Sequence, residues 1–160
     1  MKKILLLLLV SFIAKPDYTA LGVAFGTTGD VDILGVGFEQ STSKFSFTTT
    51  AGRAEAFGIS SSVFATGFNY AFTDFNEGSF YVGASYSRAM AGDVTVSDTL
   101  LSLGYAKSSG DGLDYGFDID SEGDLSVGFT SWFEDGLGIG AGVAFLEDDE
   151  ALTLTFLYKW

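Results

Sequence analysis

The chain has 160 residues, with 8 Lys+Arg against 21 Asp+Glu, a net charge of −13, and neither Cys nor His. This length allows one domain, and the missing Cys and His exclude disulfides, zinc ribbons, thiol catalysis and every His-assisted nucleophile. The acidic balance excludes a nucleic-acid surface, which needs clustered Lys and Arg. Because 47% of the residues are nevertheless hydrophobic and the mean hydropathy is +0.30, we expect part of the apolar surface to face lipid.

The first residues predict a secretory signal peptide over 1–14. Lys2 and Lys3 precede an apolar run that continues to Ala14, and Lys15-Pro16-Asp17 ends it. The run is shorter than the roughly 20 residues that a spanning helix requires, and a membrane anchor is the alternative. The cleavage site stays open, because Phe12 stands where a small residue is normal. Residues 15–160 then form the folded domain.

From Tyr18 onward, side chains alternate with a period of two residues, which predicts an all-β fold. Turn-forming residues separate ten expected strands, and eight strands is the alternative if the weak third strand and its partner are loops. The ten ranges are 18–26, 31–39, 44–50, 63–72, 79–87, 97–106, 113–120, 125–133, 137–146 and 151–160. Two connections are expected to be longer, at 51–62 and 88–96.

The two faces of the expected strands differ in size and polarity. One face of the last strand carries large apolar side chains, and the other carries Thr153, Thr155, Leu157 and Lys159. Few charged residues fall within the strands, whereas a water-facing sheet surface is normally studded with them. A face of small residues fits the inside of a narrow barrel. The sequence therefore predicts a closed antiparallel transmembrane β-barrel with its apolar face outward, since unpaired backbone groups are not tolerated in lipid. A secreted soluble β-barrel binding an apolar ligand is a further alternative.

Two motifs carry a resemblance to a known family. The run Phe80-Tyr81-Val82-Gly83-Ala84-Ser85-Tyr86 resembles a strand of the opacity-protein and porin-like group of small Gram-negative outer-membrane barrels. The C-terminal pattern resembles the signal that the outer-membrane assembly machinery reads, although Phe is a commoner last residue than Trp. That pattern consists of Leu152, Leu154, Phe156, Tyr158 and Trp160. The resemblance implies export through the periplasm, residence in the bacterial outer membrane and contact with its lipid, but it implies no single function.

The outer connections are the next candidates. If both chain ends are periplasmic, the two long connections around Arg53 and Met90 lie outside the cell. Arg53 and Arg88 are then outer-loop residues that bind lipid phosphate or a ligand, or that pair with neighbours such as Glu55 and Asp93.

The expected lumen carries carboxylates. Asp114, Asp118 and Asp120 share the inward face of one strand, and Lys44 and Lys159 are the nearby basic candidates. One hypothesis is a cation-attracting wall, and the other is that the acids pair with basic residues and fill the barrel. Asp118 and Asp120 also begin a pattern similar to a calcium loop, but its twelfth position is not Glu. Trp132 and Trp160 are expected to be interfacial anchors.

These observations predict a non-enzymatic outer-membrane barrel without cofactor, porin-like or structural, with a narrow lumen that prefers small cations. The alternative is an adhesin or surface-recognition barrel that acts through its outer loops.

Overall fold

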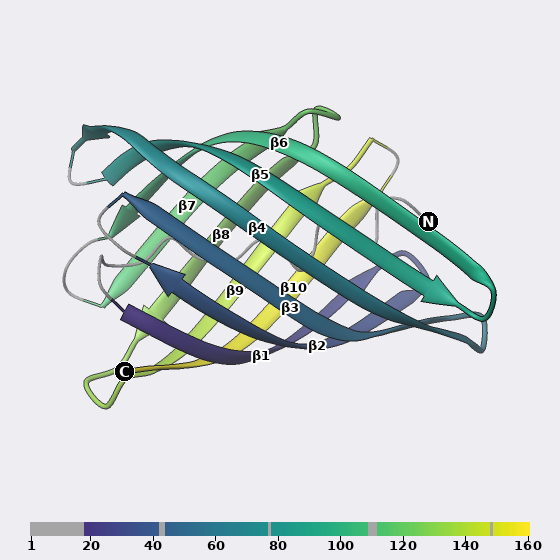
Figure 1. Ribbon diagram of the computed structural model, residues 1–160. Helices are drawn as coiled ribbons and strands as arrows, with labels where there is room; N and C mark the ends of the chain where they lie inside the picture. Colours follow the sequence, from purple (N-terminus) through teal and green to yellow (C-terminus); the bar gives the residue numbers. More distant parts are fainter. Residues whose placement is uncertain (1–17, 42–43, 77, 109–111, 148) are drawn as a thin grey trace.

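The computed structural model describes residues 18–41, 44–76, 78–108, 112–147 and 149–160, so the predicted signal peptide lies outside the described residues. These residues form ten antiparallel strands and no helix (Figure 1). The strands are β1 (Tyr18–Thr28), β2 (Val31–Ser41), β3 (Phe45–Ala56), β4 (Ile59–Phe75), β5 (Gly78–Ala91), β6 (Val94–Ser108), β7 (Leu113–Asp120), β8 (Leu125–Trp132), β9 (Leu137–Phe145) and β10 (Glu150–Lys159). The predicted all-β class and strand number are confirmed, and the eight-strand alternative is wrong.

The sheet closes because β10 pairs with β1. The first and last strands exchange backbone hydrogen bonds between Thr19 and Trp160, at 3.0 and 3.3 Å, so β1 begins and β10 ends at the same end of the barrel. We call this the terminal end and the other the opposite end. Closure leaves no sheet edge across the middle of the wall, as spanning in lipid requires.

The strands are strongly tilted. We can follow the paired residues from strand to strand once around the wall, starting at Tyr115 near the terminal end of β7. The path arrives at β6 near the opposite end of the barrel. The path runs through Phe129, Ala141, Leu154, Phe25, Leu34, Arg53, Ser62, Met90 and Thr95. This stagger is what closes a barrel of tilted strands.

The prediction of two long connections, at 51–62 and 88–96, is wrong. Ala56 pairs with Ile59 and Ala91 pairs with Val94, so each connection is a tight turn between strands that continue past the expected boundaries. Phe57 and Gly58, with φ of 51° and 74°, form the first turn, and Gly92, with φ of 57°, opens the second. Figure 1 shows these two hairpins extending furthest at the opposite end.

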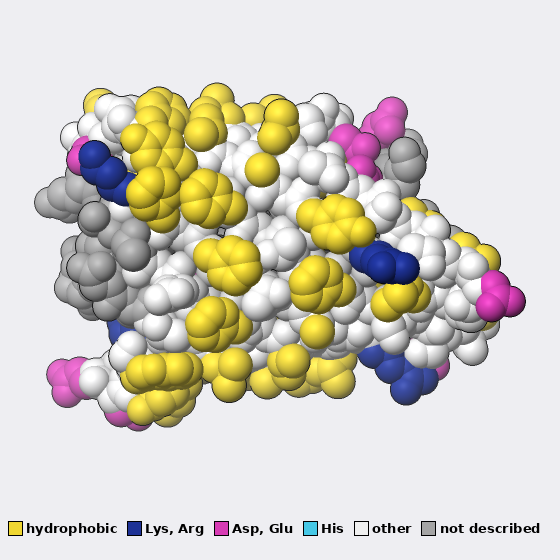
Figure 2. Space-filling view, in the orientation of Figure 1, with side chains coloured by type: hydrophobic (Ala, Val, Ile, Leu, Met, Phe, Trp, Pro, Cys, Tyr) yellow, Lys and Arg dark blue, Asp and Glu magenta, His cyan; other side chains and the backbone are white. Residues whose placement is uncertain are grey.

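The outer wall is apolar across its middle. On β10, for example, Leu152, Leu154, Phe156 and Tyr158 are between 42% and 55% exposed, while Thr153 and Thr155 are buried. Large hydrophobic side chains recur on the same outward face of the other strands, and charged side chains lie toward the two ends (Figure 2). An apolar belt on a closed barrel is the signature of a membrane-spanning barrel. It contradicts the alternative of a soluble barrel, whose outer face would be wet.

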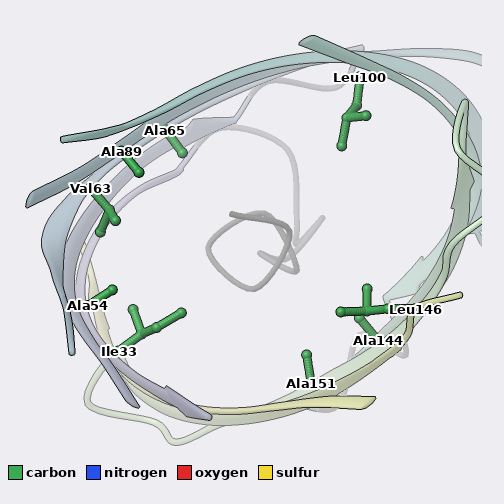
Figure 3. Packing of buried hydrophobic residues seen from close by; sticks show 9 residues of the cluster. All are labelled: Ile33, Ala54, Val63, Ala65, Ala89, Leu100, Ala144, Leu146 and Ala151. Atoms are coloured by element: carbon green, nitrogen blue, oxygen red, sulfur yellow. The ribbon is translucent and has the colours of Figure 1, made fainter. Parts of the chain in front are cut away.

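A second apolar cluster lies inside the barrel. Aliphatic side chains from seven strands and from Leu146, just after β9, point inward and surround the lumen (Figure 3). The cluster consists of Ile33, Ala54, Val63, Ala65, Ala89, Leu100, Ala144, Leu146 and Ala151. Most of these residues lie in the half of their strand nearer the opposite end, so the lumen has an apolar collar on that side.

Candidate functional site

The inner wall of the barrel carries more acids than bases. Strand alternation turns a set of charged side chains inward, where each is buried or half-buried. The buried or half-buried inward charged residues of the described strands are Glu39, Asp98, Asp114, Asp118 and Asp120, with Lys159 as their basic counterpart. Lys44, by contrast, is exposed beside the turn that precedes β3 and does not belong to the inner wall.

The terminal end of the lumen contains a hydrogen-bonded group. The indole Nε1 of Trp132 donates to Oδ2 of Asp114 over 2.8 Å, and both residues are buried. The ammonium of Lys159 lies 4.2 Å from the centre of the Trp132 ring, which is the geometry of a cation–π contact. Leu157 and Ala20 pack against the same indole. Asp114 is therefore held by a packed, hydrogen-bonded group centred on the Trp132 indole, and this group narrows the terminal end of the lumen.

Trp132 is not the interfacial anchor that the sequence predicted. It is only 8% exposed and points inward, whereas Trp160 is 64% exposed on the outside. The room for an inward indole comes from Gly138 on β9, where an added Cβ would lie 2.6 Å from Trp132 Cε3. A glycine opposite a large ring is a common way to fill a narrow barrel.

Asp118 lies on β7, as Asp114 does, but nearer the opposite end of the barrel. The hydroxyl of Tyr81 donates to Asp118 Oδ2 over 3.3 Å, across β6. The intervening β6 residue is Gly104, and a Cβ there would meet the Tyr81 ring at 2.4 Å. The pair thus depends on a glycine between two larger inward residues. Tyr81 lies between Phe80 and Val82 in an apolar run, and nothing in its residue type separates it from outward aromatic residues. Only its place in the alternation of β5 shows that it points inward.

Asp120 closes the β7–β8 turn. Its Oδ1 accepts hydrogen bonds from the backbone N–H groups of Glu122 (2.8 Å) and Asp124 (3.1 Å). This is a local turn geometry of the kind that Asp commonly makes. In the described part of the chain, no group of three or more Asp and Glu residues is arranged to hold a metal ion. The calcium-loop pattern therefore finds no matching geometry there.

Five buried oxygens of the inner wall have no hydrogen-bond partner among the described residues. They are Asp98 Oδ2, Asp120 Oδ2 and the hydroxyls of Thr130, Thr153 and Thr155. Buried polar groups are normally satisfied by protein or by water. A lumen that admits water would satisfy all five.

Arg53 and Arg88 are not on outer loops. Arg53 lies in β3 and Arg88 in β5, and both point outward. Arg53 donates to Ser60 Oγ and lies 3.9 Å from Glu55, one of the pairings that the sequence suggested. The turns beyond these two arginines are short, so β3 and β5 extend past Arg53 and Arg88. Both residues therefore lie on the barrel wall and not in a loop.

Glu39 and Asp98 are inward charges that the sequence analysis did not select. Glu39 is 5% exposed and shares the inward face of β2 with Ile33 and Ser41. Asp98 shares the inward face of β6 with Leu100. The signal that identifies both is alternation alone, counted from the apolar outward residues of each strand.

A likeness to a solved porin structure bears on the fold. No family model and no curated protein sequence matches the chain. Among solved structures, the KdgM porin superposes with a TM-score of 0.55 at 10% identity, covering 87% of this chain and 98% of that one. AlkL matches with a TM-score of 0.42 at 10% identity, covering 94% of both chains, and Ail of Yersinia pestis with 0.31 at 10%, covering 91% of this chain and 100% of that one.

At such low identity, the KdgM likeness establishes the fold and nothing finer. The chain has the fold of an outer-membrane β-barrel. With its closed sheet and its apolar outer belt, it is a protein of the bacterial outer membrane, as the sequence predicted.

Proposed function

We propose that this protein is a narrow, non-enzymatic channel of the outer membrane that prefers small cations. The observation that carries the proposal is the charge of the inner wall: within the described strands, five buried or half-buried inward carboxylates face one inward ammonium, that of Lys159. Carboxylates that line a pore attract cations and repel anions. The five unpartnered oxygens of the same wall support a lumen that water enters.

The inner wall also limits what passes. The Trp132–Asp114 group narrows the terminal end, and the apolar collar that includes Leu100 narrows the other half. Apolar constrictions oppose ion passage because a charged solute loses its hydration there. The expected conductance is therefore small, and the expected solutes are small hydrated cations.

Planar-bilayer recording tests the proposal. We expect discrete conductance steps and, across a potassium chloride gradient, a reversal potential of the sign that cation flow produces. The variant Asp98→Asn/Asp118→Asn removes two inward charges and should move the reversal potential toward zero. Asp32→Asn removes one outward charge and serves as the matched control, since Asp32 is exposed on the outer face of β2. The absence of conductance would refute the channel, and a preference for chloride would refute its proposed selectivity for cations.

A second function is supported by a different feature. The tips of the two long hairpins expose apolar side chains: Phe57 is 83% exposed, Ile59 65% and Val94 57%. Apolar groups at the end of a protruding hairpin are typical of a binding surface. This supports an adhesin or surface-recognition barrel, although the surface would be formed by hairpin tips and not by long loops. Loss of cell or partner binding in Phe57→Ser/Ile59→Ser, with folding intact, would favour this function.

Export completes the proposal. Residues 1–14 act as a signal peptide, and residues 15–160 reach the outer membrane through the periplasm. The assembly machinery reads the C-terminal alternation, which the outward side chains Phe156, Tyr158 and Trp160 support by standing together on one face of the last strand. Both chain ends then lie on the periplasmic side, and the opposite end faces the cell exterior.

A further inference from the structure

Arg53 and Arg88 occupy neighbouring places on the outer wall. Along β4, Ser62 pairs with both Arg53 and Met90, and the next outward residue, Phe64, pairs with Arg88. The arginines therefore stand on β3 and β5 with one strand between them, at nearly the same height. Two strand spacings separate their backbones by about 10 Å. Both arginine side chains occupy outward positions of their strands, so the two guanidinium groups lie on the outer side of the barrel wall.

Both arginines sit where the apolar belt ends. Toward the terminal end, the outward face of β5 continues from Arg88 to Tyr86 and Val82, and that of β3 continues from Arg53 to Phe47. Toward the opposite end, the outward face turns polar on β3, with Glu55, and on β4, with Ser60. On β5 it stays apolar, because Met90 follows Arg88 and is 38% exposed. Figure 2 shows basic side chains at the margins of the belt. In a membrane, this boundary is the headgroup level.

The guanidinium groups are only partly used by the protein. Within the described residues, Arg88 makes no hydrogen bond and no ion pair. Arg53 donates to Ser60 Oγ and has a distant contact of 3.9 Å with Glu55, and those two charged side chains are 67% and 60% exposed. A lipid-facing Arg without a counter-ion is unfavourable, and the cost falls when an anion is present. Arginine also presents a planar fork that fits phosphate oxygens.

We propose that Arg53 and Arg88 together bind the phosphate group of a lipid in the outer leaflet. The acyl chains of this lipid lie along the belt below, against Phe64 and Tyr86, which are 39% and 40% exposed. The site rests on the proposed orientation, with the terminal end in the periplasm. It does not depend on whether the lumen conducts.

The acidic residues around the site define the direction of approach. Asp32 and Glu55 are paired neighbours on the outward faces of β2 and β3, one step beyond Arg53. They repel an anion that arrives from the aqueous side. A phosphate attached to a membrane lipid reaches the arginines from below, along the apolar wall, where no charged side chain of β3, β4 or β5 stands within the belt.

The test compares lipid selectivity at the barrel surface. The folded protein is placed in phosphatidylcholine vesicles, and electron paramagnetic resonance measures how much spin-labelled phosphatidic acid or phosphatidylcholine is immobilised by the protein. We expect a preference for phosphatidic acid of roughly fivefold per arginine. In Arg53→Gln/Arg88→Gln this preference should disappear, while Arg88→Lys should retain part of it, since Lys keeps the charge without the fork.

Lys44→Gln is the matched control, because it removes an exposed positive charge at the terminal end. It should leave the preference unchanged, and a heat-dependent band shift verifies that each variant is folded. A preference that survives in Arg53→Gln/Arg88→Gln, or that Lys44→Gln reduces equally, would overturn the proposal. Excess inorganic phosphate should displace little of the labelled lipid, and full displacement would show a free-phosphate site instead. The conductance of the double variant reports separately on the channel.

Discussion

Trp132 Nε1 donates a hydrogen bond of 2.8 Å to Asp114 Oδ2 inside the barrel, 18 residues away along the chain. The bond joins the first half of β7 to the end of β8, and the contact with Lys159 extends it to β10. Three strands near the closure of the barrel are thus connected through one buried indole. Because Asp114 is only 4% exposed, its carboxylate depends on these partners.

The first prediction concerns that bond. Trp132→Phe keeps an aromatic ring but removes the indole donor, so the buried carboxylate of Asp114 loses a partner. We expect the free energy of unfolding in lipid vesicles to fall by about 1–3 kcal/mol, measured by urea titration. Trp160→Phe is the matched control, because Trp160 is exposed and its ring is retained. Equal effects of the two substitutions would contradict a special role for the internal hydrogen bond.

The second prediction concerns the space beside the indole. Gly138→Ala places a Cβ 2.6 Å from Trp132 Cε3, a distance at which the ring or the strand must move. We expect a loss of stability of about 1–3 kcal/mol in the wild-type background. In a Trp132→Ala background the same change should cost much less, and a double-mutant cycle measures the difference. Additive effects would mean that the glycine serves another purpose.

The sequence predicted the sheet well because alternation is a local signal. Each strand that crosses the belt has large residues on one face, and the pattern from Leu152 to Trp160 is unbroken. Trp132 illustrates where local reasoning fails. It has the parity of Ser126 and Thr130 on β8, which is inward, but its place near the expected periplasmic rim suggested an interfacial anchor. The room it occupies is provided by Gly138 on the next strand, and such room depends on register, which composition does not reveal.

The prediction that Arg53 and Arg88 lie in loops was wrong for a different reason. Residues 51–62 include Gly52 and three consecutive serines, so the segment has the composition of a loop. The strands nevertheless continue to a turn at Phe57-Gly58, where Phe is an unusual choice because it must adopt a positive φ. Hydrogen bonding along the hairpin, from Ala56–Ile59 to Phe45–Tyr70, overrides the weak propensity of the individual residues.

The third prediction tests the outward belt. Val36 and Val94 are equally exposed, at 57%, but Val36 lies in the middle of β2 and Val94 at the tip of the β5–β6 hairpin. Val36→Arg should lower the free energy of unfolding in vesicles by about 2–4 kcal/mol, because it places a charge in hydrocarbon. Val94→Arg should change it by less than about 1 kcal/mol. A neutral effect at Val36 would mean that this face of the barrel is in water.

The last prediction concerns the hairpin tip. Phe57 holds a φ of 51° and is 83% exposed, so it has an unfavourable backbone conformation without burial to offset it. With Gly58 at 74°, the turn has the pattern that Asn-Gly satisfies best. Phe57→Asn should therefore raise the free energy of unfolding by about 1 kcal/mol. Ile59→Asn is the control, since Ile59 is exposed but is not among the residues of positive φ, and it should bring no gain. If Phe57→Asn stabilises the barrel and also abolishes surface binding, the phenylalanine is retained for recognition at the expense of stability. If binding is unchanged, the exposed tip has no role in recognition, and the hairpins serve the barrel alone.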